Sequence, residues 1–152
     1  MFGTQQNINQ YQKVSIESGV DAANPIELIV MLYDGAILAS NSAIPYIKKN
    51  DYKLKGEFIY KAIRIIQLGL KMSLNYEVGG EITTNLDALY TYMTNLLIKA
   101  NIENVEQPVH EVVKLLTELR GAWVAISKTD AAKMVSNKKA VAVNDVAYME
   151  KV

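Results

Sequence analysis

His110 is the only histidine of the chain, and histidine is the side chain most often used to move protons near neutral pH. A Ser-His-Asp triad would need it as the base, yet the sequence holds no Gly-x-Ser-x-Gly elbow. A metal site needs several His, Cys or carboxylate ligands on facing helices, and here Glu106 alone precedes His110 at helical spacing. We therefore expect no catalytic residue, no cofactor and no metal, and predict that the protein is not an enzyme.

Phosphate-binding chemistry has little support in the sequence. Gly79-Gly80 lacks a Lys-Ser/Thr partner and Gly35 stands alone inside a predicted helix, so neither forms a phosphate-binding loop. The 16 basic and 16 acidic residues give a formal net charge of zero, which provides no broad basic field for a phosphate backbone. We expect no nucleic-acid partner.

The composition predicts one domain without disulfides. The chain has 152 residues, of which 50% are hydrophobic and none is Cys, and a chain of this length buries roughly 70% of its unfolded surface. Its first residues lack the basic patch and apolar run of a signal peptide, and no stretch reaches the ~18 uninterrupted apolar residues of a membrane span. We therefore expect a cytoplasmic protein with no direct membrane insertion.

Apolar residues spaced three and four apart predict two helices in the first half of the chain. The first begins at Asn24-Pro25-Ile26-Glu27, where Asn caps, Pro suits the first helical position and Glu completes a capping box. It is expected to end or kink near Pro45. The second begins near Asp51.

Two further helices follow in the second half. The third comes after a break at Gly79-Gly80 and carries its apolar stripe from Leu86 to Ala100. A polar turn over residues 101–107 leads to the fourth, whose stripe runs from Val109 to Ile126. Short links between the four helices predict antiparallel neighbours.

The expected fold is therefore all-α, an antiparallel four-helix bundle over residues 24–128. Residues 1–23 are rich in Gln, Asn and Ser and predict a flexible, mobile N-terminal arm. Residues 129–152 have weaker patterning and predict either a short fifth C-terminal helix or a loose tail.

The second predicted helix carries more apolar surface than a bundle helix needs. Two neighbouring rows share it: Leu54, Phe58, Ala62, Ile65 and Met72 in one, and Ile59, Ile63, Ile66, Leu70 and Leu74 in the other. Two explanations stay open. Either the terminal segments cover the surplus permanently, or it forms a groove for an amphipathic helix of another chain.

A second hypothesis makes His110 a phosphate acceptor, because histidine phosphotransfer domains are also four-helix bundles with one exposed histidine. Those domains carry His-x-x-Lys-Gly around the histidine, whereas Lys114 stands one place late here and no glycine follows. Under this hypothesis His110→Gln abolishes function. Under the alternative that the histidine is merely solvated, the substitution is silent.

Several blocks of the sequence, from about Tyr11 to Ile126, resemble the flagellar secretion chaperone FliS family. Residues 24–36 read NPIELIVMLYDGA, which is similar to the first-helix signature of that family. Residues 79–82 read GGEI and residues 85–93 read NLDALYTYM, which resemble its third helix. ELR at residues 118–120, followed by Ala122-Trp123, resembles the fourth.

This resemblance implies a helical bundle that binds the C-terminal segment of flagellin in the cytosol. Family members prevent premature polymerisation of that segment and assist its delivery to the flagellar type III secretion apparatus. The implied partners are the flagellin C-terminal segment, the cytosolic domain of the flagellar export-gate membrane protein and a possible co-chaperone. Such a protein is not an enzyme.

The resemblance also implies partner-binding residues, of which Tyr11 matches a tyrosine associated with covering the groove and with export-gate recognition. The others lie in the first and third helices: Leu32, Tyr33, Leu89, Tyr92, Met93, Leu96 and Leu97. Tyr90 and Tyr92 are two residues apart and so face different directions on a helix, and Tyr92 is the better candidate for the groove edge. A charge placed at Met93 or Leu97 is expected to weaken binding.

Overall fold

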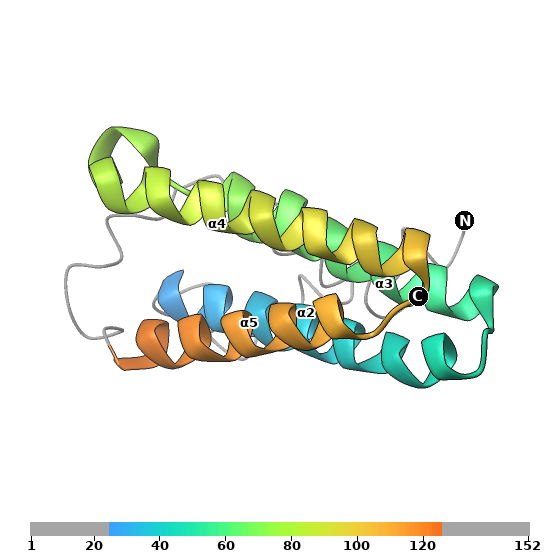
Figure 1. Ribbon diagram of the computed structural model, residues 1–152. Coiled ribbons are helices and arrows are strands. Elements are labelled where there is room, and N and C mark those ends of the chain that lie inside the picture. The colour runs from blue at the N-terminus through green and yellow to red at the C-terminus, as the bar shows by residue number, and fades with distance from the viewer. Residues whose placement is uncertain (1–24, 126–152) are drawn as a thin grey trace, which may run out of the picture.

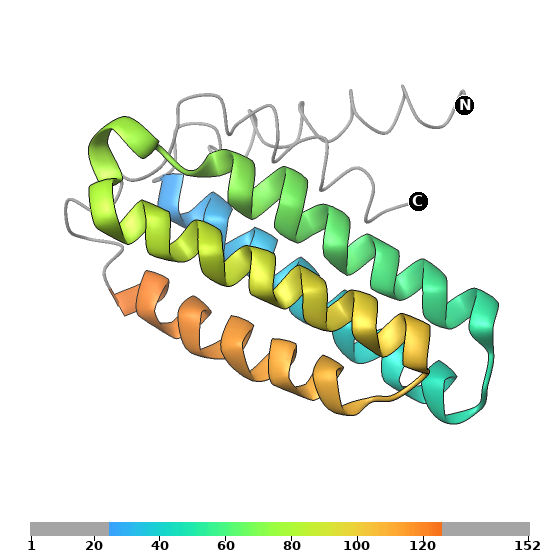
Figure 2. The same cartoon turned by 45° about the horizontal axis from the view of Figure 1, so that its top comes forward.

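The computed structural model of the protein describes residues 25–125. Successive helices run in opposite directions and form a bundle (Figures 1 and 2). Their bounds are Pro25–Lys48 for α2, Tyr52–Arg64 for α3, Tyr76–Glu103 for α4 and Gln107–Ala125 for α5. The predicted all-α, antiparallel four-helix bundle is confirmed, while the predicted N-terminal arm and fifth helix lie outside the described residues.

α2 runs through Pro45 and ends at Lys48, three residues later, which agrees with the predicted end near the proline. Pro45 removes the hydrogen bond to the carbonyl of Asn41, but both residues are exposed, where water can satisfy the freed carbonyl. The helix stops instead at Asn50, which adopts a left-handed conformation with φ 58°. The amide of Asp51 then donates to the carbonyl of Tyr46, the pattern of a Schellman motif.

α3 begins as predicted, because the Asp51 side chain accepts from the amide of Leu54 at 3.2 Å and caps the helix. After Arg64 the chain widens into a π-helical segment, Ile65–Leu70, and then tightens into a 3-10 turn, Lys71–Ser73. A π turn holds more residues than an α turn. Ile65 and Ile66 of this segment are both buried in the core.

α4 has the predicted break near its start. Asn75 caps the first turn by accepting from the amide of Glu77, and Gly80 then adopts φ 57° and ψ −129°, a conformation that residues with a Cβ avoid. Regular helix follows and continues to Glu103, three residues into the polar turn that was predicted over residues 101–107. Asn104 ends it in a left-handed conformation, and its side chain donates to Asn50 at 2.7 Å, which joins two turns at one end of the bundle.

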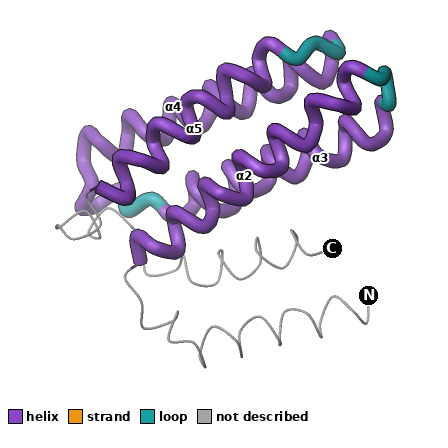
Figure 3. The backbone as a smooth tube through the Cα atoms, turned by 90° about the horizontal axis from the view of Figure 1, so that it is seen from below, coloured by secondary structure: helices purple, strands orange, loops and turns teal. Residues whose placement is uncertain are grey.

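The core lies between the four helices, where α2 contacts α3 and α5, and α4 contacts α5 and α3. Figure 3 shows α2 and α3 side by side along one face of the bundle. By length and composition alone α2 could cross a membrane. In the structure its apolar row is instead part of the core: Ile26, Ile29, Leu32, Tyr33, Ala36, Ala43 and Ile47 are buried.

Candidate functional site

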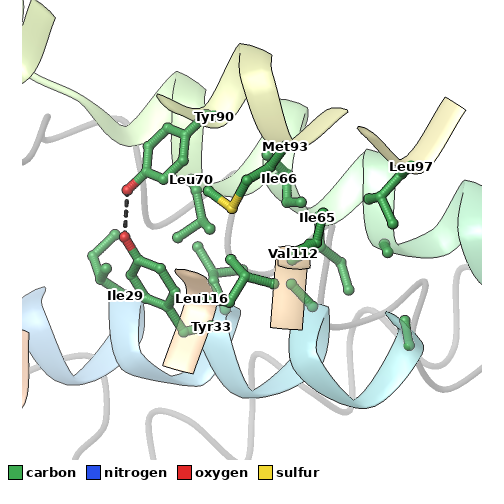
Figure 4. Packing of buried hydrophobic residues seen from close by; sticks show 14 of the residues in the cluster. Ile29, Tyr33, Ile65, Ile66, Leu70, Tyr90, Met93, Leu97, Val112 and Leu116 are labelled. Atoms are coloured by element: carbon green, nitrogen blue, oxygen red, sulfur yellow. Dashed lines mark hydrogen bonds between the residues drawn. The ribbon is translucent and has the colours of Figure 1, made fainter. Parts of the chain in front are cut away.

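A buried polar cluster joins three of the four helices. The hydroxyl groups of Tyr33 in α2 and Tyr90 in α4 are hydrogen-bonded at 2.6 Å (Figure 4). The indole nitrogen of Trp123 in α5 donates to the Tyr33 hydroxyl at 2.9 Å. All three side chains are buried. Because an unpaired hydroxyl or indole N–H is unfavourable in a core, this cluster fixes the relative positions of α2, α4 and α5.

The cluster should make the bundle sensitive to alkaline pH. Burial raises the pKa of Tyr33 to about 12, and burial together with the neighbouring Tyr33 raises the pKa of Tyr90 well above 10. Above pH 10 the unfolded chain releases protons that the native chain keeps, so stability is unaffected below pH 10 and falls above it. Because both tyrosines contribute, we expect the free energy of unfolding to fall as the pH rises above 10, by up to about 3 kcal/mol per pH unit.

Urea unfolding at about pH 8 and about pH 11 measures this slope. Tyr33→Phe should roughly halve it, whereas Tyr60→Phe, at an exposed tyrosine, serves as the matched control. If the folded protein showed all nine tyrosines ionising together near pH 10, the cluster would not be protected in the way the structure indicates.

The residues predicted to bind a partner divide into two groups. Leu32, Tyr33, Met93 and Leu97 are buried, and Figure 4 shows the last three among the packed side chains of the core. Leu89 and Leu96 are half-buried against the core and Tyr92 is exposed. Tyr11 lies outside the described residues. Partner contact by any of these residues stays a prediction.

Tyr92 lies at the seam between α4 and α5, where its hydroxyl donates to the carboxylate of Glu111. This hydrogen bond raises the pKa of Tyr92, since ionisation of the hydroxyl would place two negative charges side by side. Tyr90 is buried and Tyr92 is exposed, which confirms that the two tyrosines face different directions.

The outer seam between α2 and α3 contains a hollow of about 440 Å³. Met31, Leu38 and Phe58 give it apolar walls, and Met31 and Leu38 are exposed. Its other lining residues are Asp34, Gly35, Ala39, Ser42 and Lys61. We refer to these eight residues as the α2–α3 hollow.

Local contacts hold both walls of the hollow in place. The ring of Phe58 stacks on that of Tyr46, with centroids 5.7 Å apart and planes 7° apart. Asp34 pairs with Arg120 of α5. Gly35 and Ala39 on α2 are small, which leaves space between Met31 and Leu38 for the side chains of a ligand.

Sequence reasoning did not predict the α2 wall of this hollow. Met31, Gly35, Leu38 and Ser42 are spaced four, three and four residues apart, which forms a second row beside the core row of the same helix. That spacing was the available signal. The α3 wall belongs to the surplus apolar surface predicted for the second helix, because Phe58 is a member of that surplus.

His110 is an exposed residue in the first turn of α5, and its Nε2 is hydrogen-bonded to Glu106 at 2.9 Å. This bond, with help from Lys48, lowers the pKa of Glu106. Within residues 25–125 no three His, Asp or Glu side chains are grouped so that they could hold a metal ion. The pair is an ordinary helix-surface contact between residues four apart.

Comparisons with known proteins agree with this architecture. The sequence model of a family described as "Flagellar protein FliS" matches residues 7–130. The flagellar secretion chaperone FliS of Salmonella typhimurium is 46% identical over 124 residues, which span 82% of this chain and 92% of that protein. The flagellar secretion chaperone FliSB of Pseudomonas aeruginosa is 42% identical over 120 residues, spanning 79% and 94% of the two chains.

A third relative, the flagellar secretion chaperone FliS of Escherichia coli, is 39% identical over 113 residues, which span 74% of this chain and 83% of that protein. Each of these matches covers most of both chains, and the family match at residues 7–130 extends over the whole four-helix bundle. The chain belongs to the FliS family of flagellar secretion chaperones.

Proposed function

We propose that this protein is a cytosolic export chaperone that binds the C-terminal segment of flagellin, prevents its premature polymerisation and assists its delivery to the flagellar type III secretion apparatus. Family membership supports the role in flagellar export. The observation that carries the binding proposal is the α2–α3 hollow, an apolar depression with exposed walls on the outside of the bundle.

The hollow suits an amphipathic helix. Met31, Gly35 and Leu38 span two turns of α2, so a helix laid along the seam meets apolar side chains at helical spacing. Phe58 provides an apolar wall from the other side, and the charged residues Asp34 and Lys61 lie at the rim. A client segment bound here would hide its own apolar face, which is the face that would otherwise drive assembly with other copies.

Affinity in this arrangement comes from a large buried area. A segment that is disordered alone must become ordered on binding, which costs about 2–5 kcal/mol of the gross interaction energy. The hollow covers only part of the seam, so we propose that the half-buried Leu89 and Leu96 and the exposed Tyr92 make further contacts. The buried Leu32, Tyr33, Met93 and Leu97 would support these surfaces from beneath.

Calorimetric titration with a peptide of the last ~40 residues of the flagellin from the same organism tests this proposal. We expect one-to-one binding with a large negative heat-capacity change, and a higher Tm of the chaperone when the peptide is present. His110→Gln should bind the peptide like the unchanged protein. Absence of binding by a chaperone shown to be folded would contradict the proposed client.

Delivery requires a second partner, and we propose the cytosolic domain of the export-gate membrane protein. The resemblance of Tyr11 to the family's N-terminal tyrosine supports this choice. Tyr11→Ala should retain peptide binding and weaken binding of the export-gate domain, which a pull-down with each partner separately would measure. A co-chaperone is a further proposed partner, with no surface assigned.

A further inference from the structure

One apolar row of α4 continues beyond the part of the core that covers it. Ile82, Leu86, Tyr90, Met93 and Leu97 follow the three-and-four spacing of one helix face. The last four are buried, yet Ile82 is 56% exposed. Val78, which precedes the break at Gly80, is exposed as well. The row therefore points toward the core at a level where the core is incomplete.

The facing part of α5 explains why these side chains are uncovered. The contact of Tyr92 with Glu111 sets the register of the two antiparallel helices. Ile82 is ten residues before Tyr92 in α4, and Gly121 is ten residues after Glu111 in α5. The two positions therefore lie at about the same height along the bundle. Ala122, three turns after Glu111 on the same face of α5, is exposed and offers only a methyl group there, while Gly121 beside it lies on the solvent face. Figure 1 shows that α4 and α5 lie farther apart here than at the opposite end.

We call this region the open end, and it comprises Ile82 of α4, Val78 just before the break at Gly80, and the exposed small residue Ala122 of α5. It is a different surface from the α2–α3 hollow. Two exposed acidic residues, Glu77 and Glu81, flank it on α4. A segment that fits the open end would be apolar on one side and carry basic residues.

We propose that residues 131–152 of this chain cover the open end in the folded protein. The described chain leaves α5 at Ala125, one turn after Ala122. The family match ends at residue 130, which leaves 22 residues beyond it. As a helix they would extend about 33 Å, more than enough to cross the first turns of α4.

Charge and spacing support this occupant. Residues 131–152 contain Lys133, Lys138, Lys139 and Lys151 against Asp145 and Glu150, so their net side-chain charge opposes that of Glu77 and Glu81. Their apolar residues can share one helix face: Ala131, Val135, Ala142, Val146 and Met149. The α2–α3 hollow has one acidic and one basic residue in its lining, Asp34 and Lys61, so it lacks the paired negative charges of the open end.

Hydrogen–deuterium exchange on the protein without a client tests the proposal independently of flagellin binding. Removal of residues 131–152 should accelerate amide exchange by about tenfold or more in residues 81–90 and leave the turn at residues 49–51 unchanged. Faster exchange at the α2–α3 hollow instead would place the segment there and overturn the proposal. Unchanged exchange everywhere would overturn it as well.

Charge-reversal substitutions in the full chain provide a second test that does not depend on the truncated protein. Glu77→Lys combined with Glu81→Lys should accelerate exchange in residues 81–90, and adding Lys138→Glu with Lys139→Glu should restore protection. Glu57→Lys, at an exposed acid on α3, is the matched control. The assignment would be overturned if the variant with both pairs reversed did not regain protection. It would also be overturned if protection rose with protein concentration, because a second copy would then be the occupant.

Discussion

Replacing Met93 by glutamate unfolds the bundle, whereas the same substitution at Met72 leaves it folded. Met93 is 0% exposed and lies in the core of α4, while Met72 is 61% exposed in the 3-10 turn after α3. A buried carboxylate without a partner destabilises a protein by about 3–5 kcal/mol, which is a large share of a typical total stability of about 5–15 kcal/mol. At Met72 we expect a change within about 0.5 kcal/mol.

Urea unfolding followed by circular dichroism measures both variants, and an unchanged slope of the free energy of unfolding against urea concentration checks that each transition remains two-state. Met93→Glu should lose most of its helical signal or unfold at a much lower urea concentration. A Met93→Glu protein as stable as the Met72→Glu control would show that this side chain reaches solvent. In that case Met93 would become a candidate for direct contact with a partner.

This result matters for the predicted partner residues, because spacing alone does not separate a core row from a binding row. Met93 and Leu97 belong to the stripe that continues through Leu86, Tyr90 and Ala100. Sequence reasoning correctly predicted that this stripe is apolar on one helix face. Whether a side chain on that face is covered depends on the three other helices, which only the assembled bundle shows.

The same distinction explains which parts of the fold the sequence predicted well. Caps and breaks are local, so the start of α3 at its Asp51 cap and the break at Gly80 could be read directly. Pro45 indicated the end of α2 to within three residues, although the proline itself does not stop the helix, because the carbonyl that it leaves unbonded is exposed to water. The π-helical segment Ile65–Leu70 has no comparable local signature. Its buried residues come from both apolar rows predicted for the second helix, Ile65 from one and Ile66 and Leu70 from the other.

Long-range polar contacts were beyond sequence reasoning for a related reason. Tyr33 and Tyr90 are 57 residues apart, and Trp123 is 90 residues from Tyr33. Nothing in their local spacing indicates that three apolar rows will place these polar atoms together. The α2–α3 hollow is likewise a property of two helices, although the second row on α2 with Gly35 inside it was visible in the sequence.

Leu38→Glu should weaken binding of the flagellin peptide by about 30–100-fold while leaving the fold intact. Leu38 is 68% exposed in the free protein, so a charge at this position carries little penalty for folding. In the proposed complex the same position is buried against an apolar helix face. A carboxylate placed there loses its water without gaining a partner, and a loss of about 2–3 kcal/mol in binding corresponds to the expected change in Kd.

Ile102→Glu is the matched control, because Ile102 is an equally aliphatic side chain that is 78% exposed on α4 and does not line the hollow. Both variants add one negative charge, so a general electrostatic effect on the peptide would appear equally in both. Thermal unfolding of each variant without peptide shows that the bundle remains folded. Equal weakening by the two substitutions would exclude the α2–α3 hollow as the principal contact surface, while selective weakening by Leu38→Glu would locate the client on it.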